Sequence, residues 1–290
     1  MLCAVGDVVE DVVVHLSGPV NLGTDTVSTV SRRRGGSAAN VAYFAAAVDG
    51  RARFVGRIGD DDTGERLIAA LHRAGVETFV EREGVTGTIV VVVDERGERT
   101  MLSDRGAAPL LTHVPDAALD GSKVLHLPLY SLTHGSVASA SVDAAHRAHE
   151  RDVAVSLDLS SVTSIVDIGA DAVAEIIAAI RPRWVLCNAE ELDAAGGLDA
   201  LARVAPWATI VTKHGADPTT VARRDGARWT TSQHPVAPVD DVVDTTGAGD
   251  AFAAGFLVAA ASGATIETSI DSAHALAART LRSAGATLAG

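Results

Sequence analysis

The sequence is poor in aromatic residues and in cysteine, and it has no long apolar segment. Phe, Trp and Tyr make up 3% of the 290 residues, so Ala, Val and Leu must form most of the core. The two cysteines, Cys3 and Cys187, each lie in an apolar run, which indicates buried strand thiols in a reducing compartment rather than a disulfide framework. No apolar stretch reaches the roughly 18–20 residues of a membrane span, and no basic, cleavable leader opens the chain. We therefore expect a cytoplasmic protein that does not enter a membrane.

Motifs of several common protein classes are also missing. Neither of the two lysines, Lys123 and Lys213, follows a glycine, so there is no Gly-Lys-Ser/Thr of a Walker A loop. No Gly-x-Gly-x-x-Gly follows the first expected strand, which argues against a dinucleotide site. The absence of Cys-x-x-Cys, His-Glu-x-x-His and Gly-x-Ser-x-Gly argues against a zinc site and a hydrolase. With 24 basic and 37 acidic residues, the net charge is −13, which disfavours nucleic acid as a partner.

Short β-branched runs alternate with alanine-rich segments along the chain. We expect strands at Leu2–Gly6, Arg53–Arg57, Lys123–Leu127, Val153–Leu157, Trp184–Asn188 and Thr209–Lys213. We expect helices at Ser37–Val48, Thr63–Ala74, Ser136–Arg151, Asp171–Ile180, Leu198–Val204, Gly249–Ala261 and Glu267–Arg282. This alternation predicts a mostly parallel sheet covered by helices on both faces, which is an α/β fold.

Two regions break the alternation, because each has two strand-like runs with no helix between them. The pairs are Val12–His15 with Val27–Val30, and Thr88–Val93 with Arg99–Ser103. A turn around Gly97 joins the second pair. We expect these strands to form a small antiparallel β lid, contributed by about residues 12–34 and 86–105, over one domain that spans residues 1–290.

A glycine-rich turn leads into the first of the two C-terminal helices. The first amides of a helix have no partner inside it and carry partial positive charge. Gly247 and Gly249 let this backbone approach an anion closely, and Ala248 adds little bulk. The charge of Asp250 would oppose a bound anion, but its carboxylate suits a base that takes a proton from a hydroxyl beside a phosphoryl group.

Four motifs together resemble those of the ribokinase-like sugar kinases, also called the PfkB carbohydrate kinase family. "DTTGAGD" at 244–250 is similar to the family's C-terminal signature, and "GGSAANVA" at 35–42 is similar to its N-terminal one. "NAEE" at 188–191 resembles its Asn-x-x-Glu motif, and "GDVVED" at 6–11 resembles the end of its first strand. The motifs occur in the family's order across roughly residues 2–286. The resemblance implies a three-layer α/β/α sandwich with a mostly parallel central sheet.

The resemblance also implies roles for individual residues. Asp250 would be the catalytic base, and Gly247, Ala248 and Gly249 would form the anion hole for the transferred phosphoryl group. The substrate-binding set would be Asp11, Gly35, Gly36, Asn40 and Arg105. A carboxylate and an amide suit a polyol because they offer acceptors and donors in fixed positions, and an arginine suits an acidic or phosphorylated ligand.

Further positions would bind ATP and metal ions. The ATP-binding set would be Thr212, Gly215 and Asn188, with added charge from Lys213. Asn188 and Glu191 would act near Mg²⁺, mostly through water. Asp244 and the carbonyl of Thr246 match positions that hold a monovalent cation, such as K⁺, in many relatives.

The sequence departs from the family pattern at two places. Ribokinases carry an Asn two residues before the position of Asp11, where this chain has Val9, so ribose is a poor candidate as substrate. The stretch "TKHGADP" at 212–218 is one residue out of step with the Thr-x-Gly-x-x-Gly of many relatives and ends in Pro218. The expected nucleotide loop therefore lacks the spacing that many relatives have.

These motifs predict an ATP-dependent kinase that phosphorylates an alcohol group of a sugar or sugar-like small molecule, with ATP and Mg²⁺ as cofactors. A nucleoside kinase of the same family is one alternative. A non-catalytic sugar or nucleotide sensor is another, although it would have no use for a base at Asp250. Exposed lid edges are usually covered, which leaves a homodimer through the lid and a monomer as open alternatives.

Overall fold

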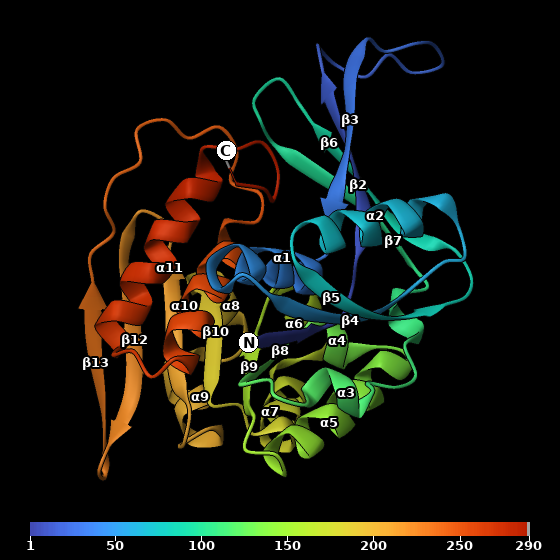
Figure 1. The fold of residues 1–290 in the computed structure, drawn as a ribbon. Coiled ribbons are helices and arrows are strands. Elements are labelled where there is room, and N and C mark those ends of the chain that lie inside the picture. The colour runs from blue at the N-terminus through green and yellow to red at the C-terminus, as the bar shows by residue number, and fades with distance from the viewer. Residues whose placement is uncertain (289–290) are drawn as a thin grey trace.

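The computed structural model describes residues 1–288. Its larger sheet has nine strands in the order β13-β12-β11-β10-β9-β8-β1-β4-β5 (Figure 1). The seven strands from β11 to β5 in this order are parallel, and β12 and β13 extend the sheet as an antiparallel hairpin. The bounds are β1 Leu2–Val5, β4 Ala52–Ile58, β5 Val76–Arg82, β8 Val124–Pro128, β9 Ala154–Asp158, β10 Trp184–Asn188, β11 Thr209–His214, β12 Asp217–Asp225 and β13 Arg228–His234.

The six parallel strands expected from the sequence are confirmed to within a residue or two at each end. Strands β5, β12 and β13 were not expected. β5 lies at one edge of the sheet, β13 lies at the other, and β12 is its neighbour. The edge strands β5 and β13 carry many polar side chains, because an edge strand is only partly covered, and both ends of β12 are exposed. All three therefore lack the continuous apolar run of a buried parallel strand.

Helices cover both faces of the large sheet, so the three-layer α/β/α fold is confirmed (Figure 1). One face carries α1 Ser37–Asp49, α2 Asp62–Arg73, α10 Ala248–Ala261 and α11 Ile266–Leu281. The other carries η1 Ala108–Leu110, α3 Asp116–Leu119, α4 Tyr130–Thr133, α5 Ser136–His149, α6 Val162–Ile168, α7 Ala170–Ile180, α8 Ala189–Ala194 and α9 Gly197–Val204.

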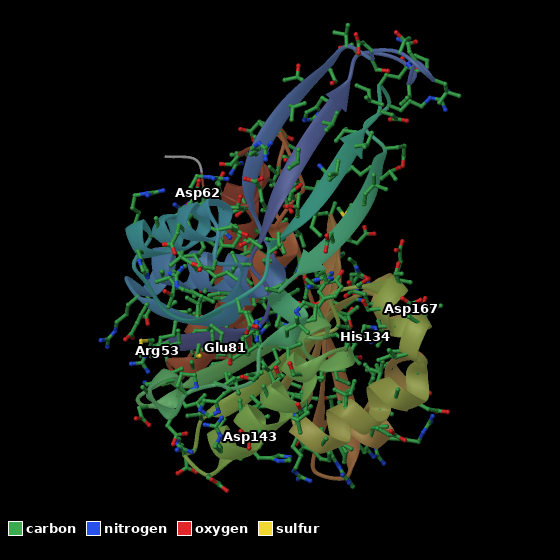
Figure 2. The ribbon with its side chains drawn as sticks, turned by 90° about the vertical axis from the view of Figure 1, so that its right-hand side faces the viewer. Arg53, Asp62, Glu81, His134, Asp143 and Asp167 are labelled. Carbon is green, nitrogen blue, oxygen red and sulfur yellow. The ribbon has the colours of Figure 1, made fainter. Side chains whose placement is uncertain are left out.

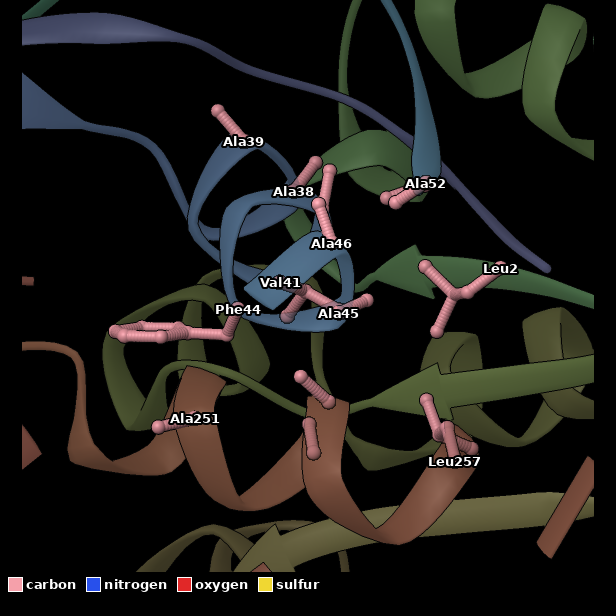
Figure 3. Packing of buried hydrophobic residues seen from close by; sticks show 14 of the residues in the cluster. Leu2, Ala38, Ala39, Val41, Phe44, Ala45, Ala46, Ala52, Ala251 and Leu257 are labelled. Carbon is pink, nitrogen blue, oxygen red and sulfur yellow. The ribbon is translucent and has the colours of Figure 1, made fainter. Parts of the chain in front are cut away.

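The helices α1 and α10 pack directly against each other over the sheet. Figure 3 shows Phe44 and Ala45 on the side of α1 that faces α10 with its Ala251 and Leu257, and Leu2 of β1 lies beside them. Small alanine side chains let the two helix backbones approach closely. This packing brings the beginnings of α1 and α10 together, although the two helices lie far apart in the sequence.

A second sheet of four strands, which we call the lid, has the order β3-β2-β6-β7. Its bounds are β2 Val9–Leu16, β3 Ser28–Gly35, β6 Thr86–Val93 and β7 Arg99–Gly106. Both expected antiparallel pairings are confirmed, and the central pair, β2 with β6, is parallel. Figure 2 shows the lid as a twisted sheet that projects from the body of the molecule. The inner side chains of β2 and β6 pack as a separate small cluster of valine and isoleucine.

Two smaller expectations concern the cysteines and membranes. Cys3 in β1 and Cys187 in β10 are fully buried free thiols, as expected, and burial raises the pKa of each thiol to about 12. Among the residues that the structure describes, no helix combines the length and the apolar character that crossing a bilayer requires.

Candidate active site

The N-terminus of α10 is an open cluster of backbone amides. Gly247 precedes the helix with φ 78°, and a Cβ at this position would lie 2.5 Å from the Cβ of Ala286, so only glycine fits. No side chain caps this helix end within residues 1–288, and no hydrogen bond engages the N–H of Gly249 or Asp250 there. The N–H of Ala248 donates to the carbonyl of Thr245 at 3.3 Å. Of the predicted anion-hole residues, Gly249 therefore presents an unpaired donor, next to that of Asp250, where the helix dipole is positive.

Asp250 lies in the first turn of α10 and is held by two residues of α1. Ser37 Oγ donates to its Oδ1 at 2.7 Å, and Asn40 Nδ2 donates to its Oδ2 at 2.9 Å. Burial raises the pKa of Asp250 to about 7, although the hydrogen bonds from Asn40 and Ser37 act in the opposite direction. A carboxyl group with this pKa accepts protons near neutral pH, as a general base must.

Gly35, the last residue of β3, lies against a second carboxylate, that of Asp11 in β2. A Cβ at Gly35 would lie 2.2 Å from Asp11 Oδ1, so the glycine makes room for this side chain. Gly36 has φ 93°, and a Cβ there would lie 2.4 Å from the carbonyl oxygen of Asp7. Burial, and then the neighbouring Asp7, raise the pKa of Asp11 to about 6.

Between the lid and the large sheet lies a cavity of about 170 Å³, which we call the lid cavity. Asp11, Gly36 and Arg105 of the predicted substrate-binding set line it, whereas Gly35 and Asn40 do not. Gly35 stands behind Asp11, and the amide group of Asn40 bonds Asp250 and Arg34. The lid side of the cavity is mixed in character. Its apolar lining residues are Val9, Val13, Ile89, Val91, Val93 and Met101, and its polar or charged ones are Asp11, His15, Arg33, Arg34, Arg99, Ser103 and Arg105.

Arg105 is tied to the body of the molecule beneath the lid. Its Nη1 donates to Oδ2 of Asp7 at 2.5 Å, and its guanidinium lies 3.9 Å from the centre of the Tyr130 ring. The ion pair and the cation–π contact fix the base of β7 to the end of β1 and the start of α4. Arg105 therefore reaches the lid cavity with part of its positive charge already neutralised.

A second and larger cavity, of about 1060 Å³, lies beside α10 and α11 and is called the helix-side cavity here. One wall is the extended segment 235–242, and another is the face of α11 with His274, Ala278 and Leu281. The N-terminus of α10 with Asp250 closes one end. The two cavities share four lining residues, Ser37, Arg99, Met101 and Thr246, so they meet beside Asp250.

An ion pair that the sequence analysis did not predict lies at this junction. Lys213 Nζ is 3.0 Å from Oδ2 of Asp158, and Asp158 is 6% exposed. Lys213 Nζ also lies 3.6 Å from the place of a Cβ on Gly249, so its charge is close to the first turn of α10. Asp158 is the last residue of β9, and Lys213 is the next-to-last residue of β11. Both sit at the carboxyl edge of the parallel sheet, where open α/β sheets bind ligands, and this position is the signal that could have identified Asp158, which the sequence analysis missed.

Asn188 and Glu191 line the helix-side cavity but also form a capping box for α8. The amide N–H of Glu191 donates to Oδ1 of Asn188, and the amide N–H of Asn188 donates to Oε2 of Glu191, both at 2.8 Å. Burial, followed by the charge of Asp158, raises the pKa of Glu191. The motif therefore has a structural role at this helix end in addition to its place in the cavity.

The expected nucleotide loop is a tight turn between β11 and β12. Gly215 lies in this turn and lines the helix-side cavity. Thr212 does not line it, because its side chain is buried with Oγ1 3.6 Å from Sγ of Cys187. Neighbouring residues of a strand point to opposite faces, so Lys213 takes the place in the cavity that the sequence analysis gave to Thr212.

Asp244 and Thr246 lie next to each other before α10, but arginines surround them. Arg99 Nη2 donates to Oδ1 of Asp244 at 2.6 Å, and Arg33 Nη1 donates to its Oδ2 at 3.3 Å. Arg99 Nη1 donates to Oγ1 of Thr246 at 2.8 Å. A bound K⁺ does not fit beside Asp244 in this arrangement, because two guanidinium groups already neutralise the carboxylate.

A family model described as pfkB family carbohydrate kinase matches residues 1–289. The chain belongs to this family. It is an ATP-dependent kinase of the carbohydrate kinase type, which phosphorylates an alcohol group of a sugar or sugar-like molecule. The resemblance stated from the sequence motifs is thereby confirmed.

Named kinases are found among the relatives of this pfkB family member. It is 33% identical over 276 residues to an adenosine kinase of Saccharomyces cerevisiae. The alignment covers 87% of this chain and 78% of the relative. It is 30% identical over 267 residues to an ATP-dependent ribose-1-phosphate kinase of Halopiger xanaduensis. This alignment covers 91% of this chain and 86% of the relative.

Solved structures support the fold. An adenosine kinase from Sinorhizobium meliloti matches with a TM-score of 0.85 at 23% identity. The superposition covers 98% of this chain and 94% of that kinase. A ribokinase from Thermotoga maritima matches with a TM-score of 0.81 at 22% identity, and this superposition also covers 98% of this chain and 94% of the other. At this identity the likeness concerns the fold, which is the expected ribokinase-like fold.

Proposed function

We propose that Asp250 removes the proton from the acceptor hydroxyl while the amides at the start of α10 stabilise charge on the transferred phosphoryl group. One observation carries this proposal. Asp250 lines the helix-side cavity, and its hydrogen-bond partner Ser37 lines both cavities. A base at this junction can reach an acceptor in the lid cavity and a phosphoryl donor in the helix-side cavity.

ATP is proposed to bind in the helix-side cavity. The apolar wall of segment 235–242 and α11 suits an adenine ring, and the N-terminus of α10 suits the phosphates. Lys213 adds positive charge beside Gly249, where the γ-phosphate would lie. The ion pair with Asp158 keeps the ammonium group oriented toward this place. We assign Lys213, rather than Thr212, to nucleotide binding.

Mg²⁺ is proposed to act with the bound triphosphate. No group of three or more His, Cys, Asp or Glu side chains among residues 1–288 is arranged to hold a metal by itself. This arrangement suits Mg²⁺, which keeps several waters and uses one or two carboxylates together with substrate phosphates. Asp158 and Glu191 both line the cavity. Burial and then the charge of Asp158 raise the pKa of Glu191, so a nearby cation would stabilise its ionised form. Bound Mg²⁺ would neutralise phosphate charge.

The acceptor is proposed to lie in the lid cavity with its hydroxyl toward Asp250. Asp11 is positioned to accept hydrogen bonds from other hydroxyl groups, and Arg105, which also lines this cavity, offers a donor. Lid closure over this cavity would exclude water, which limits wasteful hydrolysis of ATP.

A nucleoside is the second candidate acceptor, because part of the lid wall of the cavity is apolar. Val13, Val91 and Met101 offer no hydrogen bonds to a sugar but can pack against the face of a base. The likeness to an adenosine kinase of Saccharomyces cerevisiae supports this candidate. The likeness to a ribose-1-phosphate kinase, together with Arg105, supports a phosphorylated sugar instead.

A panel assay tests the function and separates these acceptors. Release of ADP from MgATP is measured with fructose, ribose, ribose 1-phosphate and adenosine, each with the wild type and with Asp250→Asn. Turnover of at least one acceptor that is lost in the variant supports the proposal. Acceptors that raise the melting temperature but are never phosphorylated would instead favour a non-catalytic sensor.

A further inference from the structure

The carboxylate of Asp244 is bound on all sides by hydrogen-bond donors. Its Oδ1 accepts from the N–H of Thr246 at 2.9 Å, from Oγ1 of Thr246 at 2.7 Å and from Nη2 of Arg99 at 2.6 Å. Its Oδ2 accepts from the N–H of Gly285 at 2.8 Å and from Nη1 of Arg33 at 3.3 Å. Partial burial alone would raise the pKa of Asp244, but bonds from Thr246, Gly285 and Arg99 hold it well below its usual range.

Both arginines come from the lid. Arg99 begins β7 and Arg33 lies in β3, and these are the two edge strands of the lid sheet. Asp244 belongs to the body of the molecule and precedes Gly247, the residue before α10, by three positions. Arg99 also bonds Oγ1 of Thr246 and lines both cavities. The lid therefore contacts the segment that shapes the anion hole through a pair of positive charges.

We infer that the guanidinium of Arg99 supplies the positive charge that a monovalent cation was expected to supply at Asp244, so this kinase does not need K⁺. A K⁺ ion beside Asp244 would lie next to two guanidinium groups and would be repelled by both. The carboxylate has no acceptor capacity left for it, since each oxygen already accepts two or three hydrogen bonds. Arg99 is a positioning residue in this account, because it acts through the segment that ends at Gly247.

Thermal unfolding tests the inference without relying on catalysis. Melting temperatures are compared in KCl and in tetramethylammonium chloride at equal ionic strength. We expect no K⁺-specific shift for the wild type. We expect Arg99→Met to gain a K⁺-specific rise of about 2–4 °C, because a cation that binds only the folded state stabilises it. Arg99→Lys should gain none, since the ammonium group keeps the charge.

A matched control removes the same charge from the same hairpin. Arg96 is exposed in the turn between β6 and β7, so Arg96→Met should behave like the wild type in both salts. If Arg99→Met does not fold, Arg33→Met serves as the second variant, because it removes the weaker of the two guanidinium contacts and leaves Arg99 in place. Arg33→Met is then expected to remain insensitive to K⁺.

The activity readout rests on the proposed function and is measured separately. ADP release by the wild type should be the same in both salts, whereas K⁺ should stimulate Arg99→Met by about fivefold or more. A K⁺-specific thermal shift in the wild type would overturn the inference, as would a folded Arg99→Met with no gain in K⁺ response. Absence of turnover together with the expected thermal shifts would reject the proposed function and leave the inference standing.

Discussion

Asn40 of α1 donates a hydrogen bond of 2.9 Å from its Nδ2 to Oδ2 of Asp250 in α10, 210 positions later in the chain. Ser37, one turn earlier in α1, donates to the other carboxylate oxygen. The N-terminal motif thus holds the carboxylate of the C-terminal motif. Asn40 was expected to bind substrate, but in this structure it fixes the orientation of the proposed base.

Removing the base tests its role most directly. Asp250→Asn should keep the fold and acceptor binding but lower kcat by roughly 10²–10⁴-fold, the usual contribution of a positioned general base. Steady-state ADP release and a thermal-shift measurement with the acceptor check the two parts. Asp240→Asn, an exposed carboxylate in segment 235–242, is the control and should retain full activity. Near-normal turnover of Asp250→Asn would show that Asp250 is not the general base.

The pH dependence follows from the pKa of Asp250, which burial raises to about 7. The base must be ionised to accept a proton, so kcat/KM should fall as the pH drops below 7. At pH 6 it should be about tenfold below its plateau. A pH profile of kcat/KM at saturating ATP measures this. A profile that stays flat down to pH 5 would contradict it.

Ser37 is expected to affect the acid limb of this profile, which is the fall of kcat/KM at low pH. Its hydrogen bond favours the ionised carboxylate, so Ser37→Ala should raise the pKa of Asp250 and move the acid limb to higher pH. The same pH profile measures the shift. Ser139→Ala is the control, because Ser139 Oγ donates only to the carbonyl of Ser136 in α5. A merely structural role for Ser37 would lower activity equally at all pH values.

Variants of the ion pair between Lys213 and Asp158 can distinguish an effect on stability from an effect on ATP binding. Lys213→Met leaves a buried carboxylate without its partner, which typically costs about 3–5 kcal/mol of the free energy of unfolding. Adding Asp158→Asn should restore much of this stability, as urea unfolding would measure. The double variant should still show a raised KM for ATP, because the charge beside Gly249 is gone. Recovery of a normal KM would show that Lys213 does not act on ATP.

Glycine at 247 is required for two reasons. Gly247→Ala places a Cβ at φ 78° and within 2.5 Å of the Ala286 Cβ, so it should destabilise the fold by about 1–3 kcal/mol and also lower kcat. Gly226→Ala shares the positive φ, at 58°, but nothing lies within 4 Å of its new Cβ. The difference between the two variants in unfolding free energy isolates the clash, and only Gly247→Ala should lose activity.

Local patterns in the sequence determined most elements and their order. Apolar β-branched runs predicted the buried parallel strands, and helical patterns predicted seven of the helices that cover them, but not the shorter η1, α3, α4, α6 and α8. Asn188 and Glu191 are spaced as a capping box, and the structure forms that box. The glycine at 247 marked a turn that opens onto a helix. Each of these features depends on residues within a few positions of one another, so the sequence alone can specify it.

Only the tertiary structure decided which side chains meet. The choice between Thr212 and Lys213 depended on which face of β11 turns toward the cavity, and one residue of strand register reverses that choice. The pairing of Arg99 with Asp244 joins the lid to a segment 145 positions away. Such contacts follow from strand order and from the way the lid lies over the sheet. No local periodicity in the sequence encodes them, because their energy is gained only once distant elements have packed together.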